Sequence, residues 1–292
     1  PMKDISVKAL AKINLGLDVV RRREDGYHEV RMIMQTIHLF DRLEISKNTS
    51  GQITMETNLA FLPTNENNLV YKAAKLLTDE FGIKDGVHVW LHKHIPVAAG
   101  MAGGSTDAAA VLYGMNRIFD LGLSKEELME RGVKIGADVP YCVMRGTALA
   151  EGIGEKLTKL PPMVKCPVLI AKPQINVSTK FVYENLKLDA DTEHPDIDRL
   201  VADIREKNLT KIAADMGNVL ETVTIPAYPV IADIKENMLQ NGAVNAMMSG
   251  SGPTVFGLFE KEADAVQAYE AMKRSGLAKQ IYLTSIYNNA RK

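Results

Sequence analysis

The glycine-rich stretch Pro96–Asp107, which reads PVAAGMAGGSTD, is the strongest chemical signal in the sequence. It follows a predicted strand directly and opens a predicted helix. Glycines let consecutive backbone N–H groups turn inward as an anion-binding nest, and the helix start adds free N–H groups and the positive end of its dipole. The stretch therefore suits a phosphate chain; the alternative is a plain strand-to-helix turn capped by Ser105.

This stretch matches neither of the two commonest nucleotide-binding motifs. No Lys follows its glycines in a GK[ST] arrangement, and the GxGxxG order with a downstream acidic residue is absent. We expect Gly103 to adopt a positive φ, at which a β-branched replacement is unfavourable.

Two shorter motifs carry weaker signals. The turn Met248–Thr254, MSGSGPT, is a second glycine-rich nest, and two nests on two lobes would fit a phosphate-bearing ligand between them. Asp138 lies in the motif GADVP, two residues after a glycine and two before a proline. By spacing alone it is a turn or cap residue more often than a catalytic one.

The motif Asp25-Gly26-Tyr27-His28 predicts a hairpin turn between two strands. An aromatic ring and an imidazole at its edge could stack on and hydrogen-bond a planar base; a solvent-exposed strand start is the alternative.

Three histidines, at positions 88, 92 and 94, share one strand face by parity. A His pair at this spacing can chelate zinc. Because no third ligand or acidic partner is evident, we interpret them as surface residues.

The elements that must position these residues follow from periodicity. Alternating apolar residues from Ile5 to Val20 predict a long strand or a bent strand pair, whose opposite face carries Lys12, Asn14 and Asp18. Caps predict a helix between Asn68 and Gly82, and a capping box starts another at Ser124. The other expected elements of this half are strands at 32–40, 43–47, 52–56 and 87–92 and a helix at 106–119.

The adjacent prolines Pro161 and Pro162 interrupt both periodicities and predict a domain boundary. We therefore expect residues 1–160 to form an N-terminal lobe with the phosphate loop and residues 161–292 to form a C-terminal lobe. The second lobe should contain an acidic loop at 189–198, helices at 230–240 and 261–274, and strands at 254–259 and 280–286, which implies layered α/β or α+β structure.

Composition excludes several classes of protein. With 35 Lys and Arg against 36 Asp and Glu, the net charge of -1 provides no basic field for nucleic acid. Cys142 and Cys166 are too few for a disulfide framework and predict reduced, cytoplasmic thiols. No apolar run approaches the length of about 18 residues that a membrane span needs, so we expect a soluble protein that is neither secreted nor membrane-bound.

Taken together, these residues resemble the GHMP kinase superfamily. Three blocks carry the resemblance, which extends over nearly the whole chain: AKINL at 11–15 followed by REDGYHE at 23–29, PVAAGMAGGSTDAA with GADVP downstream, and MSGSGPT. The resemblance implies a two-lobe α+β fold, with ATP and substrate in a cleft between an N-terminal α/β lobe and a smaller ferredoxin-like C-terminal lobe.

The resemblance also implies an activity. KINL followed by DGYH is typical of the superfamily members that phosphorylate the 2-hydroxyl of 4-diphosphocytidyl-2-C-methyl-D-erythritol in the non-mevalonate route to isoprenoid precursors. ATP would be the co-substrate, Mg²⁺ the phosphate counterion, and the acceptor a small molecule with a cytidine diphosphate group.

Residue roles follow from the same resemblance. Asp138 would be the base and Lys12 would orient it, while Asn68 and Lys93 would lie near the adenine. Asn14, Tyr27 and His28 would hold the diphosphocytidyl end. A second stacking aromatic falls at Tyr183, or at Phe181 two residues away. The loop that would wrap the ATP phosphates comprises Pro96, Val97, Ala98, Ala99, Gly100, Met101, Ala102, Gly103, Gly104, Ser105 and Thr106.

One departure from the family pattern lies in this loop. It reads Ala98-Ala99-Gly100 where many relatives carry more glycine, which reduces the choice of positive-φ positions.

Two rival functions remain open at this point. One is another small-molecule kinase of the homoserine or mevalonate type, against which the DGYH motif argues. The other is an inactive nucleotide-binding regulator on the same fold, against which the presence of both Lys12 and Asp138 argues. A monomer and a homodimer are equally compatible with the sequence.

Overall fold

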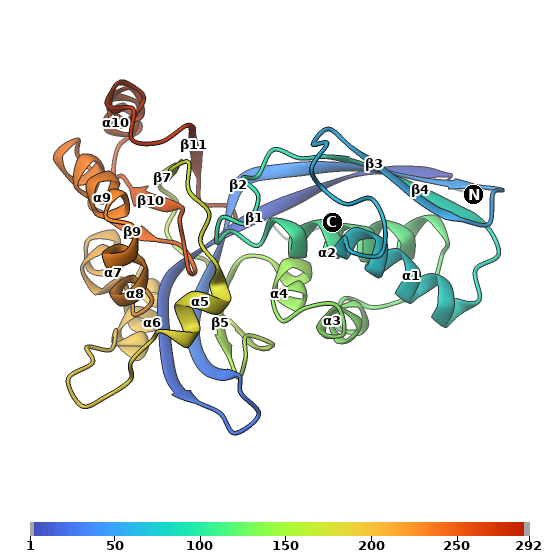
Figure 1. Ribbon diagram of the computed structural model, residues 1–292, viewed down its shortest axis with the longest axis horizontal. Coiled ribbons are helices and arrows are strands. Elements are labelled where there is room, and N and C mark those ends of the chain that lie inside the picture. The colour runs from blue at the N-terminus through green and yellow to red at the C-terminus, as the bar shows by residue number, and fades with distance from the viewer. Residues whose placement is uncertain (1–2, 289–292) are drawn as a thin grey trace. The chain divides into compact units, whose positions relative to one another are not determined.

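The computed structural model describes residues 3–288 and divides them into two compact units (Figure 1). The first unit comprises the chain up to Ala11, Leu39–Val97 and Ala102–Met144. The second comprises Lys12–His38, Ala98–Met101 and the chain from Arg145 onward. The chain passes from one unit to the other within its first two strands and again within the glycine-rich stretch.

The first unit is a sheet with helices packed on it. Its strands lie in the order β3-β4-β2-β1, with β3 parallel and β2 antiparallel to β4. Among the helices, α2 packs against α1, α3 and α4. The elements are β1 (Asp4–Arg22) and β2 (His28–Asn48), which both continue into the second unit, β3 (Ile53–Thr57), α1 (Leu69–Phe81), β4 (Gly86–His92), α2 (Gly103–Ile118), α3 (Lys125–Val133) and α4 (Val139–Met144).

In the second unit, β5 (Thr147–Glu151) pairs with β2 and with β6 (Lys156–Lys159), and β8 (Gly217–Asn218) pairs with β1. A separate antiparallel sheet has the order β11-β7-β10-β9 and carries α9 and α10 (Figure 1). The remaining bounds are β7 (Pro167–Lys172), α5 (Thr179–Glu184), α6 (Ile197–Arg205), α7 (Leu209–Asp215), α8 (Glu221–Ala227), α9 (Val230–Gln240), β9 (Asn245–Met248), β10 (Val255–Leu258), α10 (Glu262–Ser275) and β11 (Gln280–Ser285).

This second sheet confirms the expected ferredoxin-like lobe. The chain order β7, α9, β9, β10, α10, β11 is a split βαβ arrangement, and the sheet order places the first and third of its strands at the centre. The α+β fold class inferred from alternating periodicities is therefore confirmed.

Capping chemistry fixes the helix ends that the sequence predicted. Asn68 accepts the amide of Val70 at the start of α1, and Gly82 ends that helix at a φ of 58°. Ser124 and Glu127 form the reciprocal capping box of α3. These ends were predictable because each depends on residues within one turn of the boundary.

Other boundaries differ from the prediction. The segments 32–40 and 43–47 are one strand, β2, and α2 begins at Gly103 instead of Thr106. α4 was not predicted at all, because GADVP has turn composition. Its residues Val139 and Tyr141 are buried, and the helix packs on α2 and α3, so tertiary contacts sustain it.

In the part of the chain that the structure describes, no helix has both the length and the apolar character needed to cross a membrane.

Candidate active site

The glycine-rich loop, residues 96–106, has three left-handed positions. The φ angles are 52° at Ala98, 86° at Gly100 and 56° at Ala102. Two alanines thus adopt the left-handed conformation that we expected of glycine alone. The expectation that fewer glycines reduce the number of positive-φ positions in the loop is therefore wrong. Gly103 does not have a positive φ, and the reason first given for its sensitivity is corrected below.

The start of α2 is open to an anion. Its N-cap is Ala102, which provides no side-chain hydrogen bond, and Ser105 lies inside the helix instead of capping it. The first backbone N–H groups of a helix have no intrahelical acceptor. In a helix of 16 residues they can bind a phosphate group in the field of the helix dipole.

The second glycine-rich turn contacts Gly100 directly. The Gly100 carbonyl oxygen accepts the Ser249 hydroxyl at 2.9 Å and the Lys12 ammonium at 3.0 Å. A Cβ atom at Gly100 would collide with the carbonyl oxygen of Ser249. This contact therefore requires glycine at position 100, and the left-handed φ favours it further.

Lys12 and Asn14 lie on the same face of β1, as strand parity predicted. The Lys12 ammonium donates to Asn14 Oδ1 at 2.7 Å, and the backbone amide of Gly250 donates to the same oxygen at 3.0 Å. Both side chains are buried, with 5% of Lys12 and none of Asn14 exposed. The Asn14 oxygen is thus fully used inside the protein, and its role in binding substrate stays a prediction.

Lys93 forms a buried ion-pair cluster in the first unit. Its ammonium lies 2.6 Å from Asp41 Oδ2 and 2.9 Å from Asp107 Oδ2. A Cβ atom at Gly103 would lie 3.1 Å from Lys93 Nζ, so this charge sits next to the first residue of α2. Burial lowers the pKa of Lys93, but the carboxylates of Asp107 and Asp41 raise it overall. The predicted contact of Lys93 with adenine is not tested.

Asp107 is the unusual member of this cluster. Burial raises the pKa of Asp107 well above its ordinary value, and Asp41 raises it further, against the opposing effect of Lys93. Its Oδ1 atom is buried without a hydrogen-bond partner among the residues described. Burial and Asp41 thus favour the neutral form of Asp107, in which the ammonium of Lys93 faces a single carboxylate charge, that of Asp41.

Asn68, the other predicted adenine contact, is used as a cap. Its Oδ1 accepts from Val70 N and its Nδ2 donates to the carbonyl oxygen of Pro63. A Cβ atom at Gly104 would lie 3.7 Å from Leu69 Cδ1, so the starts of α1 and α2 are neighbours.

Asp138 immediately precedes α4 and is half-buried. Its backbone carbonyl accepts the amide of Cys142, which opens the helix, while Pro140 occupies the first turn where no N–H is needed. The position of Asp138 at a helix start agrees with the cap interpretation, and its catalytic role stays a prediction.

The hairpin between β1 and β2 brings aromatic groups together. It is a five-residue loop in which Gly26 has a φ of 87° and Tyr27 is 61% exposed. The His28 ring lies 5.1 Å from the Tyr183 ring, at an interplanar angle of 46°. Burial, with a contribution from Arg22, lowers the pKa of His28, so its imidazole is neutral at pH 7.

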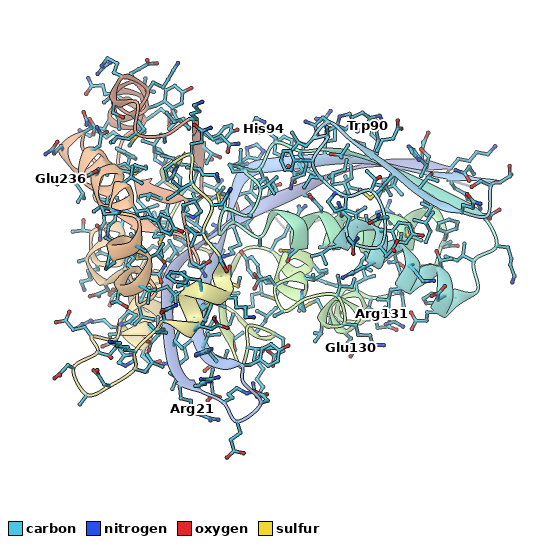
Figure 2. The ribbon with its side chains drawn as sticks, in the orientation of Figure 1. Arg21, Trp90, His94, Glu130, Arg131 and Glu236 are labelled. Atoms are coloured by element: carbon cyan, nitrogen blue, oxygen red, sulfur yellow. The ribbon has the colours of Figure 1, made fainter. Side chains whose placement is uncertain are left out.

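The histidines of β4 do not form a zinc site. β4 ends at His92, so His94 lies beyond the strand; Figure 2 labels His94 apart from Trp90, which lies within β4. His88 pairs with Glu56 at 2.8 Å and His92 with Glu44 at 3.4 Å. The expectation that they lack acidic partners is therefore wrong. No group of three His, Cys, Asp or Glu residues able to hold a metal occurs within residues 3–288.

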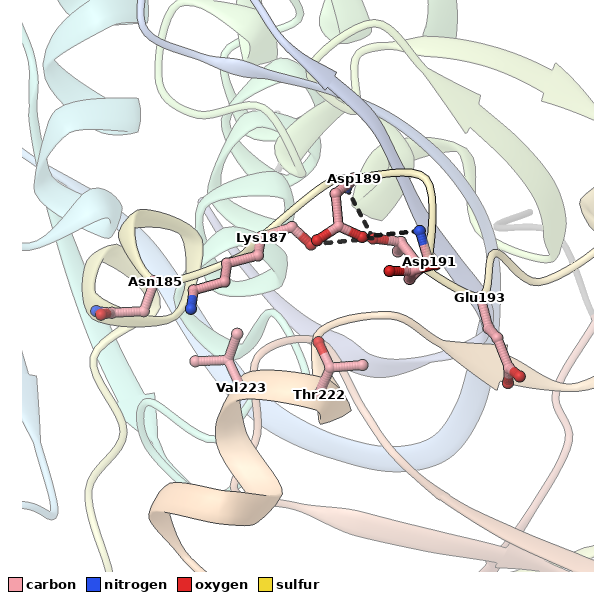
Figure 3. Close-up of a pocket in the computed structure, with 8 residues that line it drawn as sticks. Asn185, Lys187, Asp189, Asp191, Glu193, Thr222 and Val223 are labelled. Carbon is pink, nitrogen blue, oxygen red and sulfur yellow. Dashed lines mark hydrogen bonds between the residues drawn. The ribbon is translucent and has the colours of Figure 1, made fainter.

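A cavity of about 530 Å³ lies in the second unit (Figure 3), and no predicted site residue lines it. Its wall includes the acidic loop at Asp189 and Asp191 and the start of α8 at Thr222. Asp189 Oδ1 accepts the backbone amide of Asp191, so part of this acidic charge is used in local turn structure.

Sequence reasoning missed three polar residues that organise the site. Asp41 and Asp107 hold Lys93, and Asn218 donates to the second glycine-rich turn. A signal existed for Asp107, because it is a charged residue immediately ahead of the apolar run Ala108–Leu112. Asp41 has no such signal, since Lys93 lies 52 residues away, and Asn218 has none toward the turn, whose two carbonyl groups lie 30 and 32 residues away.

Comparisons with known proteins agree with this geometry. Residues 68–146 match the GHMP kinases N terminal domain and residues 190–278 the GHMP kinases C terminal domain. The 4-diphosphocytidyl-2-C-methyl-D-erythritol kinase of Lachnospira eligens is 57% identical over 98% of this chain and 99% of its own. The enzyme of that name from Acetivibrio thermocellus is 52% identical over 94% of this chain and 96% of its own.

Solved structures give the same result. A crystal structure of 4-(cytidine 5'-diphospho)-2C-methyl-D-erythritol kinase superposes with a TM-score of 0.83 at 29% identity, covering 98% of this chain and all of that one. The homoserine kinase of Cytophaga hutchinsonii has a TM-score of 0.82 at 20% identity, over 99% of this chain and 96% of its own, and shows a shared fold alone. The chain belongs to the GHMP kinase family and, within it, to the group of 4-diphosphocytidyl-2-C-methyl-D-erythritol kinases.

Proposed function

We propose that this kinase transfers a phosphoryl group from ATP to the 2-hydroxyl of 4-diphosphocytidyl-2-C-methyl-D-erythritol, in the non-mevalonate route to isoprenoid precursors. The observation that carries the substrate assignment is the aromatic group at the β1–β2 hairpin, where the His28 ring meets Tyr183 and the preceding residue, Tyr27, is exposed.

The chemistry of this group suits a cytosine. Exposed aromatic faces stack on a base, each worth about 1 to 3 kcal/mol. A neutral imidazole can accept or donate a hydrogen bond at the base edge, and the lowered pKa of His28 keeps it neutral. Homoserine and mevalonate have no planar ring and would leave these groups unused, so we favour the cytidine-bearing substrate.

The ATP phosphates would bind at the glycine-rich loop and the uncapped start of α2. The Thr106 hydroxyl lies in the first turn of α2, buried without a hydrogen-bond partner in the described part of the chain. Such an oxygen fits Mg²⁺, which prefers hard ligands and is usually shared with substrate phosphates. When bound, the ion would neutralise phosphate charge, held by Thr106 and the phosphates.

Within this proposal Asp138 is the base that accepts the proton of the acceptor hydroxyl. Lys12 offsets the negative charge that develops on that oxygen and orients the carboxylate. Phosphoryl transfer asks little covalent chemistry of the protein, so positioning and charge stabilisation supply most of the rate. The buried ammonium of Lys12 fits this role, because its fixed acceptors Asn14 and Gly100 leave it little freedom.

ATP as co-substrate and the buried thiols of Cys142 and Cys166 support a cytoplasmic location.

An ADP-release assay tests the proposal. The enzyme is supplied with ATP, Mg²⁺ and, in parallel reactions, the diphosphocytidyl substrate, homoserine or mevalonate. We expect ADP release above the no-acceptor blank with the first substrate alone, and inhibition of that reaction by cytidine. Faster turnover of homoserine or mevalonate would show that the enzyme is a kinase of that type instead. Absence of ADP release with every acceptor would favour an inactive nucleotide-binding regulator.

A further inference from the structure

Asn218 holds the second glycine-rich turn from inside the second unit. Its amide nitrogen donates to the carbonyl oxygens of Met248 at 2.9 Å and Gly250 at 2.8 Å. Its amide oxygen accepts the backbone amide of Leu220 at 3.0 Å. The residue is 6% exposed, so both donors of the amide are committed to this turn and water cannot replace them.

The turn held in this way presents one amide to Asn14. The backbone N–H of Gly250 donates to Asn14 Oδ1 at 3.0 Å, and the Lys12 ammonium donates to the same oxygen at 2.7 Å. The two donors fill both lone pairs of that oxygen and fix the rotation of the Asn14 amide. A continuous series of hydrogen bonds therefore runs from Asn218 through Gly250 and Asn14 to Lys12.

A second contact ties the same turn to Lys12. The Ser249 hydroxyl donates to the Gly100 carbonyl oxygen, which also accepts the Lys12 ammonium. Both of these acceptors of Lys12 thus depend on where the turn lies. Gly250 has no room to move toward the loop, since an added Cβ would be 3.1 Å from the Gly100 carbonyl oxygen.

We propose that Asn218 is a positioning residue for phosphoryl transfer, which fixes the Lys12 ammonium through Gly250 and Asn14. The inference rests on the proposed function, in which Lys12 is catalytic. Asn218 touches no reacting atom in this account. It acts because a displaced Gly250 amide frees Asn14 to rotate, and the Lys12 ammonium then loses one of its fixed acceptors.

The test variant is Asn218→Asp, which keeps the size of the side chain but turns a carboxylate oxygen toward two carbonyl oxygens. We expect kcat to fall about 10- to 100-fold, the scale of a misplaced catalytic group, with KM for ATP and acceptor within about threefold of wild type. The matched control is Asn208→Asp at the cap of α7, where either residue accepts the Lys211 amide and kcat should stay unchanged.

A double mutant separates positioning from a general loss of structure. In a Lys12→Met background, Asn218→Asp should cost less than about twofold in single-turnover rate, because the group it positions is already gone. A purely structural role predicts the full 10- to 100-fold loss again, and that result would overturn the proposal. So would an unchanged kcat in a well-folded single variant.

Hydrogen exchange provides a readout independent of turnover, with Asn218→Ser as a milder variant. We expect the Gly250 amide to exchange at least about tenfold faster in Asn218→Ser than in wild type, with amides of α10 unchanged. Unaltered Gly250 exchange would refute the series of hydrogen bonds. This experiment tests the series of hydrogen bonds even if wild-type enzyme fails to phosphorylate the diphosphocytidyl substrate, an outcome that would refute the proposed function.

Discussion

At the scale of single residues, buried polar groups account for most of the order in the candidate site. Lys12 and Lys93 are both long cationic side chains that usually extend into water, yet each is held by fixed oxygen acceptors. Burying a charge is costly unless it is paired, so these lysines hold the surrounding backbone in place. The two clusters lie in different units, and each can be perturbed separately.

The first residue-scale prediction concerns the protonation of Asp107. Its raised pKa means that the folded protein holds a proton there that the unfolded chain releases above the ordinary value of 3.8. Wild type should therefore lose stability relative to Asp107→Asn as the pH rises. Asparagine mimics the protonated acid, so the variant should lie within about 1 kcal/mol of wild type at pH 5.

Urea unfolding at pH 5 and pH 8 would measure both effects. Asp107→Ala is the matched control, because it removes the acceptor and leaves Lys93 short of a partner, at a cost of about 1 to 3 kcal/mol. If Asn and Ala substitutions destabilise equally, Asp107 is ionised and the neutral assignment is wrong.

The second residue-scale prediction concerns the aromatic hairpin group. Tyr27→Ala and Tyr183→Ala should each weaken binding of the diphosphocytidyl substrate by about 1 to 3 kcal/mol and leave ATP affinity unchanged. Phe181→Ala is the matched control: it lies on the same helix as Tyr183 and is 42% exposed, but Tyr183 is the one whose ring meets His28. Calorimetric titration with cytidine diphosphate and with a non-hydrolysable ATP analogue would compare the two affinities. A larger loss of cytidine diphosphate affinity in Phe181→Ala than in Tyr183→Ala would make Phe181 the second stacking aromatic.

At the scale of elements, the glycine-rich loop and the start of α2 form one continuous segment, whose conformation depends on two glycines for different reasons. Gly100 needs its left-handed φ and the space beside Ser249. Gly103 needs room beside Lys93, and not a special φ as the sequence had suggested. Local sequence predicted that the loop is sensitive, but the physical cause at each position depends on tertiary neighbours.

We predict that Gly100→Ala and Gly103→Val both raise KM for ATP, by about tenfold or more, because the loop must move to relieve strain at position 100 or crowding at position 103. Gly104→Ala is the control, since its Cβ would make an ordinary 3.7 Å contact with Leu69 and its φ is not left-handed. Initial rates across ATP concentrations, beside thermal melts, measure the effect. An unchanged KM in both variants would remove the phosphate-binding assignment of the loop.

Element prediction succeeded where local chemistry decides and failed where tertiary packing does. The ends of α1 and α3 follow from Asn68, Gly82 and the Ser124 capping box. The short helices α4 to α8, of six to nine residues, were not predicted. A helix this short does not form alone in water, so its existence depends on burial that a local pattern does not encode.

At the scale of the whole molecule, the pairing of distant chain segments is the feature of the fold that the sequence predicts least well. The structure groups Lys12–His38 with the chain beyond Arg145, and β1 pairs in parallel with a strand about 200 residues away. Loop closure over such separations leaves no local pattern. A division of the lobes at residue 160 stays a prediction. Three motifs on distant segments nevertheless predicted the family, because each keeps its own local chemistry.

The last prediction concerns Asp138, the proposed base, and Lys12, the lysine that would orient it. The proposed reaction needs both groups at one acceptor hydroxyl. Asp138→Asn keeps the shape of the side chain but removes its charge and basic oxygen, so single-turnover phosphoryl transfer should fall about 10² to 10⁴-fold with ATP affinity kept. Lys12→Met should cost a comparable factor.

The double mutant distinguishes this mechanism from two separate structural roles. Groups that act on one proton transfer are non-additive, so Asp138→Asn with Lys12→Met should fall far short of the product of the single losses. Thermal melts must accompany the kinetics, because Asp138 also begins α4 through its backbone carbonyl, a bond that Asn preserves. A folded Asp138→Asn enzyme with near-native turnover would show that the carboxylate serves α4 alone, and the base would have to be sought elsewhere in the site.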